Sequence, residues 1–122
     1  MTSHSRVHRG YATQRLAAAY LRRWWPYAEP TGAGRSGSDI TGVPFDIEIK
    51  ARNRADLAAI MKQLEHRDDG RIGVGLMRLN GQGPASIDNW VAVIRFEDVA
   101  NLLAIAYNAQ PIETQIPETL QP

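Results

Sequence analysis

The sequence predicts a single α/β domain with a mixed central sheet and helices on both of its faces. Three segments carry apolar residues at helical spacing, near residues 10–25, 54–67 and 96–107. Between them lie shorter runs that alternate or are continuously apolar, as strands do. The 122 residues are enough for one domain with its own core. The expected order is therefore a helix, three strands, a helix, two strands and a C-terminal helix.

The first helix is expected from Gly10 to Trp25, after a basic arm at residues 1–9. Its apolar stripe contains Leu16, Tyr20, Leu21 and Trp24, widened by three alanines. Pro26 should end this helix, because proline disfavours helical conformation in the residue before it. A short strand at residues 27–29 and a glycine-rich loop at residues 31–37 should follow.

Residues 38–52 are the centre of the predicted fold, as two short strands around a Gly-Val-Pro turn. Asp46, Glu48 and Lys50 alternate along the second strand and therefore share one face. If the pair folds back about this turn, Asp39 lies opposite Glu48, with Cβ atoms roughly 5 Å apart. Two carboxylates this close, beside an ammonium group, suit a divalent metal and a negatively charged substrate.

The second helix is expected at residues 54–67, with Asn53 as its N-cap. Its apolar stripe contains Leu57, Ile60, Met61 and Leu64. Residues 72–76 then alternate between large apolar residues and glycine, which predicts a strand. The two glycines indicate that another backbone or a helix packs closely over their face of the sheet.

The last elements are a strand at residues 90–94 and a helix at residues 96–107. The strand is apolar throughout, which predicts that it is covered on both sides. Residues 110–122 are polar and rich in proline, and we expect an extended tail or an arm against a partner subunit. No linker divides the chain, so residues 1–122 are predicted to form one domain.

Composition restricts the protein's class and compartment. The chain has no cysteine, which excludes disulfides and thiolate metal sites. No apolar run approaches the roughly 20 residues of a membrane span, and the first ten residues lack the apolar segment of a secretory signal. We therefore expect a cytoplasmic protein that does not enter membranes. Residues 1–54 carry nine basic and four acidic side chains, a net +5 that suits a polyanionic partner.

Asp39, followed by Glu48-Ile49-Lys50, resembles the motif of the PD-(D/E)XK nuclease superfamily. The words GRSGSDI and IEIKAR resemble those of archaeal-type Holliday-junction resolvases and related small phage nucleases. The resemblance extends from Gly10 to about Gln63. It implies a restriction-endonuclease-like αβββαβ core, to which this chain adds a C-terminal helix, and a bacterial or phage-infected host cell.

The resemblance also implies a reaction and a role for each motif residue. The reaction is hydrolysis of DNA phosphodiester bonds by an endonuclease that depends on Mg²⁺ or Mn²⁺. Asp39 and Glu48 would bind the ion through their carboxylates, with the backbone carbonyl of Ile49 as a further ligand. Lys50 would orient the attacking water or stabilise the developing negative charge. The implied substrate is branched DNA such as a Holliday junction, cut by a homodimer.

Four other residues bear on this ligand set. Gln14 stands where resolvase-like members carry a helical glutamate, so it is a candidate ligand that adds no negative charge. Glu29 is either a third carboxylate of the site or a surface residue. Gln63 either supports the site or is simply exposed. Asp46 shares the face of Glu48 and is expected behind the metal ligands or facing solvent.

Arg35, Ser36, Arg52 and Arg54 flank the motif and are the predicted DNA contacts. Arginine contacts to phosphates fix position and make binding strongly dependent on salt. Three other functions remain open at the level of sequence. One is a catalytically idle nucleic-acid-binding module that keeps the nuclease fold, which the glutamine at position 14 would favour. Another is a nuclease that acts on single strands or ends. The third is a structural or assembly protein in which the charges of the hairpin are incidental.

Overall fold

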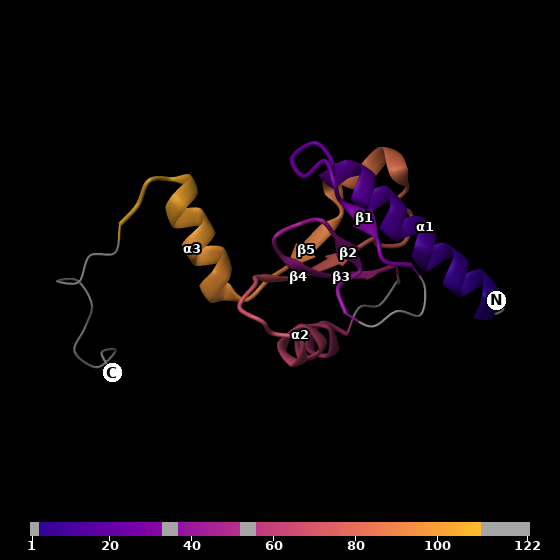
Figure 1. Ribbon diagram of the computed structural model, residues 1–122, viewed down its shortest axis with the longest axis horizontal. Coiled ribbons are helices and arrows are strands. Elements are labelled where there is room, and N and C mark those ends of the chain that lie inside the picture. The colour runs from indigo at the N-terminus through magenta and orange to yellow at the C-terminus, as the bar shows by residue number, and fades with distance from the viewer. Residues whose placement is uncertain (1–2, 33–36, 52–55, 111–122) are drawn as a thin grey trace.

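The computed structural model describes residues 3–32, 37–51 and 56–110, with residues 3–9 described as backbone only. It confirms the α/β class (Figure 1). The elements are α1 (Ser3–Leu21), β1 (Glu29–Pro30), β2 (Ile40–Thr41), β3 (Asp46–Lys50), α2 (Leu57–His66), β4 (Gly73–Met77), the 3₁₀ helix η1 (Pro84–Asn89), β5 (Val91–Val93) and α3 (Phe96–Ala106). None of the helices in these described ranges is long and apolar enough to cross a membrane.

The described strands form two separate sheets instead of one. β3, β4 and β5 make a three-stranded mixed sheet, in which β4 is parallel to β3 and antiparallel to β5. β1 and β2 pair only with each other, as a short antiparallel ribbon. The prediction of a mixed sheet is confirmed. The prediction that the first three strands belong to this same sheet is wrong. β2 is only two residues long, and side chains replace part of the ladder that would join it to β3.

α1 covers one face of the structure, against the β1–β2 ribbon and β3. The side chains that it buries most fully are Thr13, Ala17 and Ala18, so the predicted stripe is displaced around the helix. The small alanines let the helix approach the sheet closely, and Ile47 of β3 belongs to the same buried cluster. Trp24, predicted to lie in the stripe, is 58% exposed because the helix has already ended.

The ends of α1 differ from the prediction at both sides. The helix begins at Ser3, so most of the segment predicted as an arm is helical. It ends at Leu21, four residues before the expected end, although Trp25 still donates its N–H to the Leu21 carbonyl at 2.9 Å. After Leu21 the N–H groups of Arg23 and Trp24 donate to carbonyls three residues back, so the chain before Pro26 continues as a tighter turn and not as α-helix.

α2 covers part of the opposite face of the sheet, over β4. Ile60 and Leu64 are buried against Met77, as the predicted stripe requires. The predicted close packing over the glycines is confirmed, because a Cβ on Gly75 would lie 2.7 Å from a methyl group of Ile60. The predicted helix start is wrong: the N-cap is Asp56, which accepts the Ala59 N–H at 3.0 Å. Asn53 lies outside the described residues.

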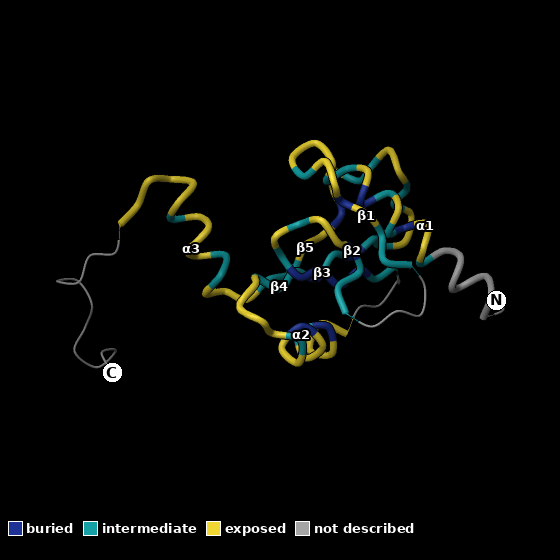
Figure 2. Tube along the Cα trace, viewed as in Figure 1, coloured by how far each residue is buried: buried dark blue, intermediate teal, exposed yellow. Residues whose placement is uncertain are grey.

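The C-terminal part of the fold is less covered than the sequence predicted. β5 is an edge strand whose Val91 is 40% exposed, so it is not covered on both sides. α3 occurs where it was expected, but none of its residues is buried. It extends away from the sheet (Figure 1), and its surface is largely exposed (Figure 2). Most of the predicted tail lies outside the described residues.

Candidate active site

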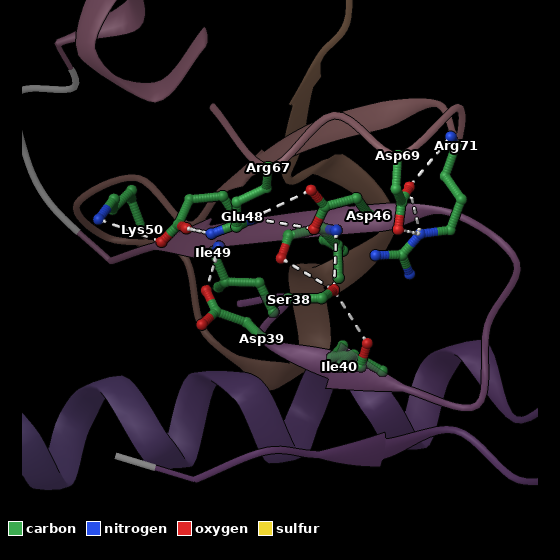
Figure 3. Close-up of polar contacts among 11 residues, drawn as sticks. Ser38, Asp39, Ile40, Asp46, Glu48, Ile49, Lys50, Arg67, Asp69 and Arg71 are labelled. Atoms are coloured by element: carbon green, nitrogen blue, oxygen red, sulfur yellow. Dashed lines mark hydrogen bonds and ion pairs between the residues drawn. The ribbon is translucent and has the colours of Figure 1, made fainter. Parts of the chain in front are cut away.

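Asp39 closes the predicted hairpin by using both its backbone and its side chain (Figure 3). Its N–H donates to the Ile47 carbonyl at 2.8 Å, and its carboxylate accepts the Ile49 N–H at 2.7 Å. The hydroxyl of Ser38 accepts the Ile47 N–H at 3.0 Å. The contacts of Asp39 therefore lie on either side of Glu48, although β2 and β3 do not pair as strands of one sheet.

The backbone of β3 has two differently occupied edges. Asp46 and Lys50 direct their hydrogen bonds to β4 and the residues flanking it. Ile47 and Ile49 direct theirs to the opposite edge, where Asp39 lies. Because the N–H and C=O of one strand residue point to the same edge, the Ile49 carbonyl also opens on the Asp39 side. This carbonyl and the Asp39 carboxylate are therefore on the same edge of β3.

The Glu48 carboxylate is buried between two cations, Lys50 and Arg67. Its Oε2 lies 3.2 Å from the Lys50 ammonium nitrogen. Its Oε1 lies 2.7 Å from Nη1 of Arg67, a short charge-assisted contact. The shared face of Asp46, Glu48 and Lys50 is confirmed, because the Arg67 guanidinium contacts both acids and Lys50 contacts Glu48.

Arg67 is the residue of this site that sequence reasoning missed. It is the C-cap of α2, and its guanidinium grips Asp46 through Nε at 3.1 Å and Nη2 at 2.9 Å. Asp46 is only 3% exposed, so the expectation that it faces solvent is wrong. A signal was present: buried acids on one strand face need a counter-charge, and α2 follows that strand directly. Burial alone would lower the pKa of Arg67, but its bonds to Asp46 and Glu48 raise that pKa.

Asp39 has the most perturbed carboxyl group in the site. Burial raises its pKa most, the Ile49 N–H lowers it, and the neighbouring Glu48 carboxyl raises it again. The Lys50 charge lowers it slightly, and the resulting pKa is about 6 instead of 3.8. The two cations contacting Glu48 therefore do not neutralise Asp39 fully. A carboxyl that is this hard to ionise beside a second acid is a common feature of functional sites.

The other candidate residues lie outside this cluster or have other partners. The side-chain oxygen of Gln14 accepts the Gly32 N–H at 3.4 Å, at the entry to the glycine-rich loop. The Glu29 carboxylate pairs with Arg22 at 3.3 Å on the outer surface. Gln63 is exposed on α2. The predicted DNA contacts, Arg35, Ser36, Arg52 and Arg54, all lie outside the described residues.

The outer side of α1 carries a hollow that sequence reasoning did not identify. Tyr11 and Arg15 line it from the helix, Arg22 lines it from just beyond the helix end, and Glu29 and Pro30 line it from β1. Arg15 places a positive charge over the Tyr11 ring, whereas Arg22 pairs with Glu29.

Within the described residues, no group of three or more histidine, cysteine, aspartate or glutamate side chains is arranged to hold a metal. The candidate donors at the site are the carboxylate of Asp39, the carbonyl of Ile49 and the carboxylate of Glu48, both of whose oxygens already contact cations. All three are hard oxygen donors, which fit Mg²⁺ or Mn²⁺ and leave further positions for water and a phosphate oxygen. Comparison of the chain with protein-family models, curated proteins and solved structures finds no match.

Proposed function

We propose that this protein is a Mg²⁺- or Mn²⁺-dependent DNA endonuclease that works in the manner of PD-(D/E)XK nucleases. The observation that supports it most is the position of Asp39, whose two contacts to β3 bracket Glu48. A purely structural strand has no need for two neighbouring acids, one of which has a pKa raised to about 6. A divalent cation between them would remove the cost of ionising them, because it stabilises both charged carboxylates.

Each residue has a distinct part in the proposed reaction. Asp39, Glu48 and the Ile49 carbonyl hold the ion. When bound, the ion supplies positive charge that polarises a phosphodiester and makes a nearby water more acidic. Lys50 stabilises the negative charge that develops on the phosphate, since its ammonium group already lies beside Glu48. The hydrophobic contacts of Ile47 and Ile49 with α1 keep β3 in place beneath these groups.

The proposed substrate is branched DNA, such as a four-way junction, cut by a homodimer. Two cuts on opposed strands need two copies of the site. The exposed apolar residues of α3, which include Phe96 at 84% exposure, offer a surface for that contact. The outer side of α1, with Tyr11 and Arg15, offers contacts to phosphates and unpaired bases.

A second candidate function is a catalytically idle nucleic-acid-binding module. The observation in its favour is that both oxygens of Glu48 already have partners, Arg67 and Lys50. Gln14, at the position of the family's helical glutamate, adds no negative charge and accepts a backbone N–H instead. Such a site would keep its shape by internal ion pairs without taking up a metal.

One experiment separates the two functions. Four-way junction, flap, duplex and single-stranded DNA are incubated with the protein and Mn²⁺, and nicking and binding are measured together. The proposed nuclease cuts the junction, and Asp39→Ala and Glu48→Ala abolish cutting while circular dichroism shows an intact fold. Asp88→Asn, an exposed acid in η1, is the matched control and should cut normally. Binding without cutting by the wild type would favour the idle module.

A further inference from the structure

Arg67 is held in the site by contacts that do not depend on Glu48. Its backbone N–H donates to the Leu64 carbonyl at 3.2 Å, which fixes its Cα at the end of α2. Its guanidinium meets the two oxygens of Asp46 with two different nitrogens, at 3.1 and 2.9 Å. Paired contacts of this kind fix the plane of the guanidinium as well as its distance. The group therefore stays over β3 whether or not Glu48 contacts it.

The contact of Arg67 with Glu48 is of a different kind. It uses a single nitrogen, Nη1, and a single oxygen, Oε1, at 2.7 Å. The other oxygen of Glu48 faces Lys50 at 3.2 Å. Both oxygens thus already carry a cationic partner, so a metal that takes either one must weaken one of these pairs. The Arg67 contact is the shorter one and joins a guanidinium that is always charged.

We propose that Arg67 is a built-in counter-cation, which competes with a divalent metal for Glu48 and thereby lowers the metal affinity of the site. This inference rests on the proposed function. Because Asp46 retains the guanidinium, Arg67 gives up Glu48 without leaving the site. The positive charge then remains close to the bound ion and opposes it. Both effects, competition for one oxygen and repulsion between cations, weaken metal binding in the wild type.

The other charged groups near the site are less suited to compete with a metal for Glu48. Lys50 contacts the other oxygen of Glu48 at the longer distance of 3.2 Å, through an ammonium group on a flexible four-carbon stem. Arg71 pairs with Asp69, an exposed residue in the turn after α2. Its charge is felt by Asp46 and Arg67, but its ion pair is with Asp69 and not with Glu48. Removing Arg67 should therefore change metal affinity, and removing Arg71 should not.

The test measures Mn²⁺ binding by titration calorimetry and by electron paramagnetic resonance, without DNA. We expect Arg67→Met to bind Mn²⁺ about tenfold more tightly than the wild type, a coupling of ordinary size between two interacting sites. Arg67→Lys, which keeps the charge, should stay near the wild type. Arg71→Met is the matched control and should leave the dissociation constant unchanged.

A further variant guards against loss of the fold, since Arg67→Met leaves Asp46 buried without its partner. Asp46→Asn/Arg67→Met removes both members of that pair and should still bind Mn²⁺ more tightly than the wild type, because Glu48 is released. Unchanged or weaker binding in both Arg67→Met proteins would overturn the inference. Failure of the proposed function gives a different result: the wild type then binds no Mn²⁺, or Asp39→Ala binds it equally well.

Discussion

Replacing Asp39 by asparagine should make the folded protein more stable at neutral pH while destroying its proposed activity. The asparagine keeps an oxygen that can accept the Ile49 N–H, now 2.7 Å from the aspartate. It removes a charge that is unfavourable in the folded state, where the Asp39 pKa is about 6 instead of 3.8. A site residue that costs stability is expected when its charge serves a ligand.

The sign and size of this effect follow from that pKa. Between pH 3.8 and about 6 the folded state holds the Asp39 proton while the unfolded state has lost it, so wild-type stability falls as pH rises. The full pKa change corresponds to about 3 kcal/mol at pH 7. The carboxyl keeps partial access to water, which reduces the expected gain to about 1–2 kcal/mol. Below the unfolded pKa the gain should vanish.

The assay is urea unfolding at pH 4.0 and pH 7.5, without divalent metal, of the wild type and Asp39→Asn. We expect the variant to be more stable at pH 7.5 and nearly equal at pH 4.0. Asp88→Asn controls for the loss of one negative charge at an exposed position. The electrostatic account of this site would be refuted if Asp39→Asn were less stable than the wild type at pH 7.5. It would also be refuted if the free energy of unfolding changed by the same amount at both pH values.

Three further predictions address packing, the proposed chemistry and the buried ion pair. Gly75→Ala should lower the free energy of unfolding by about 1–3 kcal/mol in urea, since its new methyl would lie 2.7 Å from Ile60, whereas Gly83→Ala meets nothing within 4 Å and should not. Lys50→Gln should slow junction cleavage about a hundredfold but retain Mn²⁺ binding, and equal loss of both would contradict its assigned part. Asp46→Asn should lower the melting temperature through a loss of about 2–3 kcal/mol, because it removes the negative charge and replaces one of the two oxygens that accept from the guanidinium; an unchanged melting temperature would mean that this pair contributes no stability.

The arrangement within β3 could be predicted because it depends on local geometry. A strand turns alternate side chains to opposite faces whatever surrounds it, so Glu48 and Lys50 had to share a face. The short turn before the strand then limited where Asp39 could lie. The glycines of β4 carried a similar local signal, since a strand position without a side chain is useful where a helix approaches. These features needed no knowledge of the rest of the chain.

The features that were missed depend on how elements pack. Arg67 reaches Glu48 across 19 positions, and only the placement of α2 brings its side chain over the acids. The apolar face of α3 was predicted, but an apolar pattern does not say what covers a helix, and nothing in the described chain buries it. β5 was expected to be covered for the same reason: a run of apolar residues suits an edge strand with one packed face as well as a central strand. Periodicity identifies faces, and tertiary packing decides their partners.

The distribution of charge in the site bears on which of the two candidate functions is more reasonable. If the acids served only to hold α2 onto the sheet, Asp46 with Arg67 would be sufficient, and that pair is well formed. Asp39 adds nothing to it and raises the electrostatic cost of the site, as its elevated pKa indicates. Three acids, Asp39, Asp46 and Glu48, face two cations, and both of these cations contact Glu48. The uncompensated negative charge therefore lies at Asp39, on the edge where the Ile49 carbonyl opens. A cation bound there would gain from Asp39 and from this carbonyl, whereas a module that only binds DNA would gain from losing Asp39 altogether.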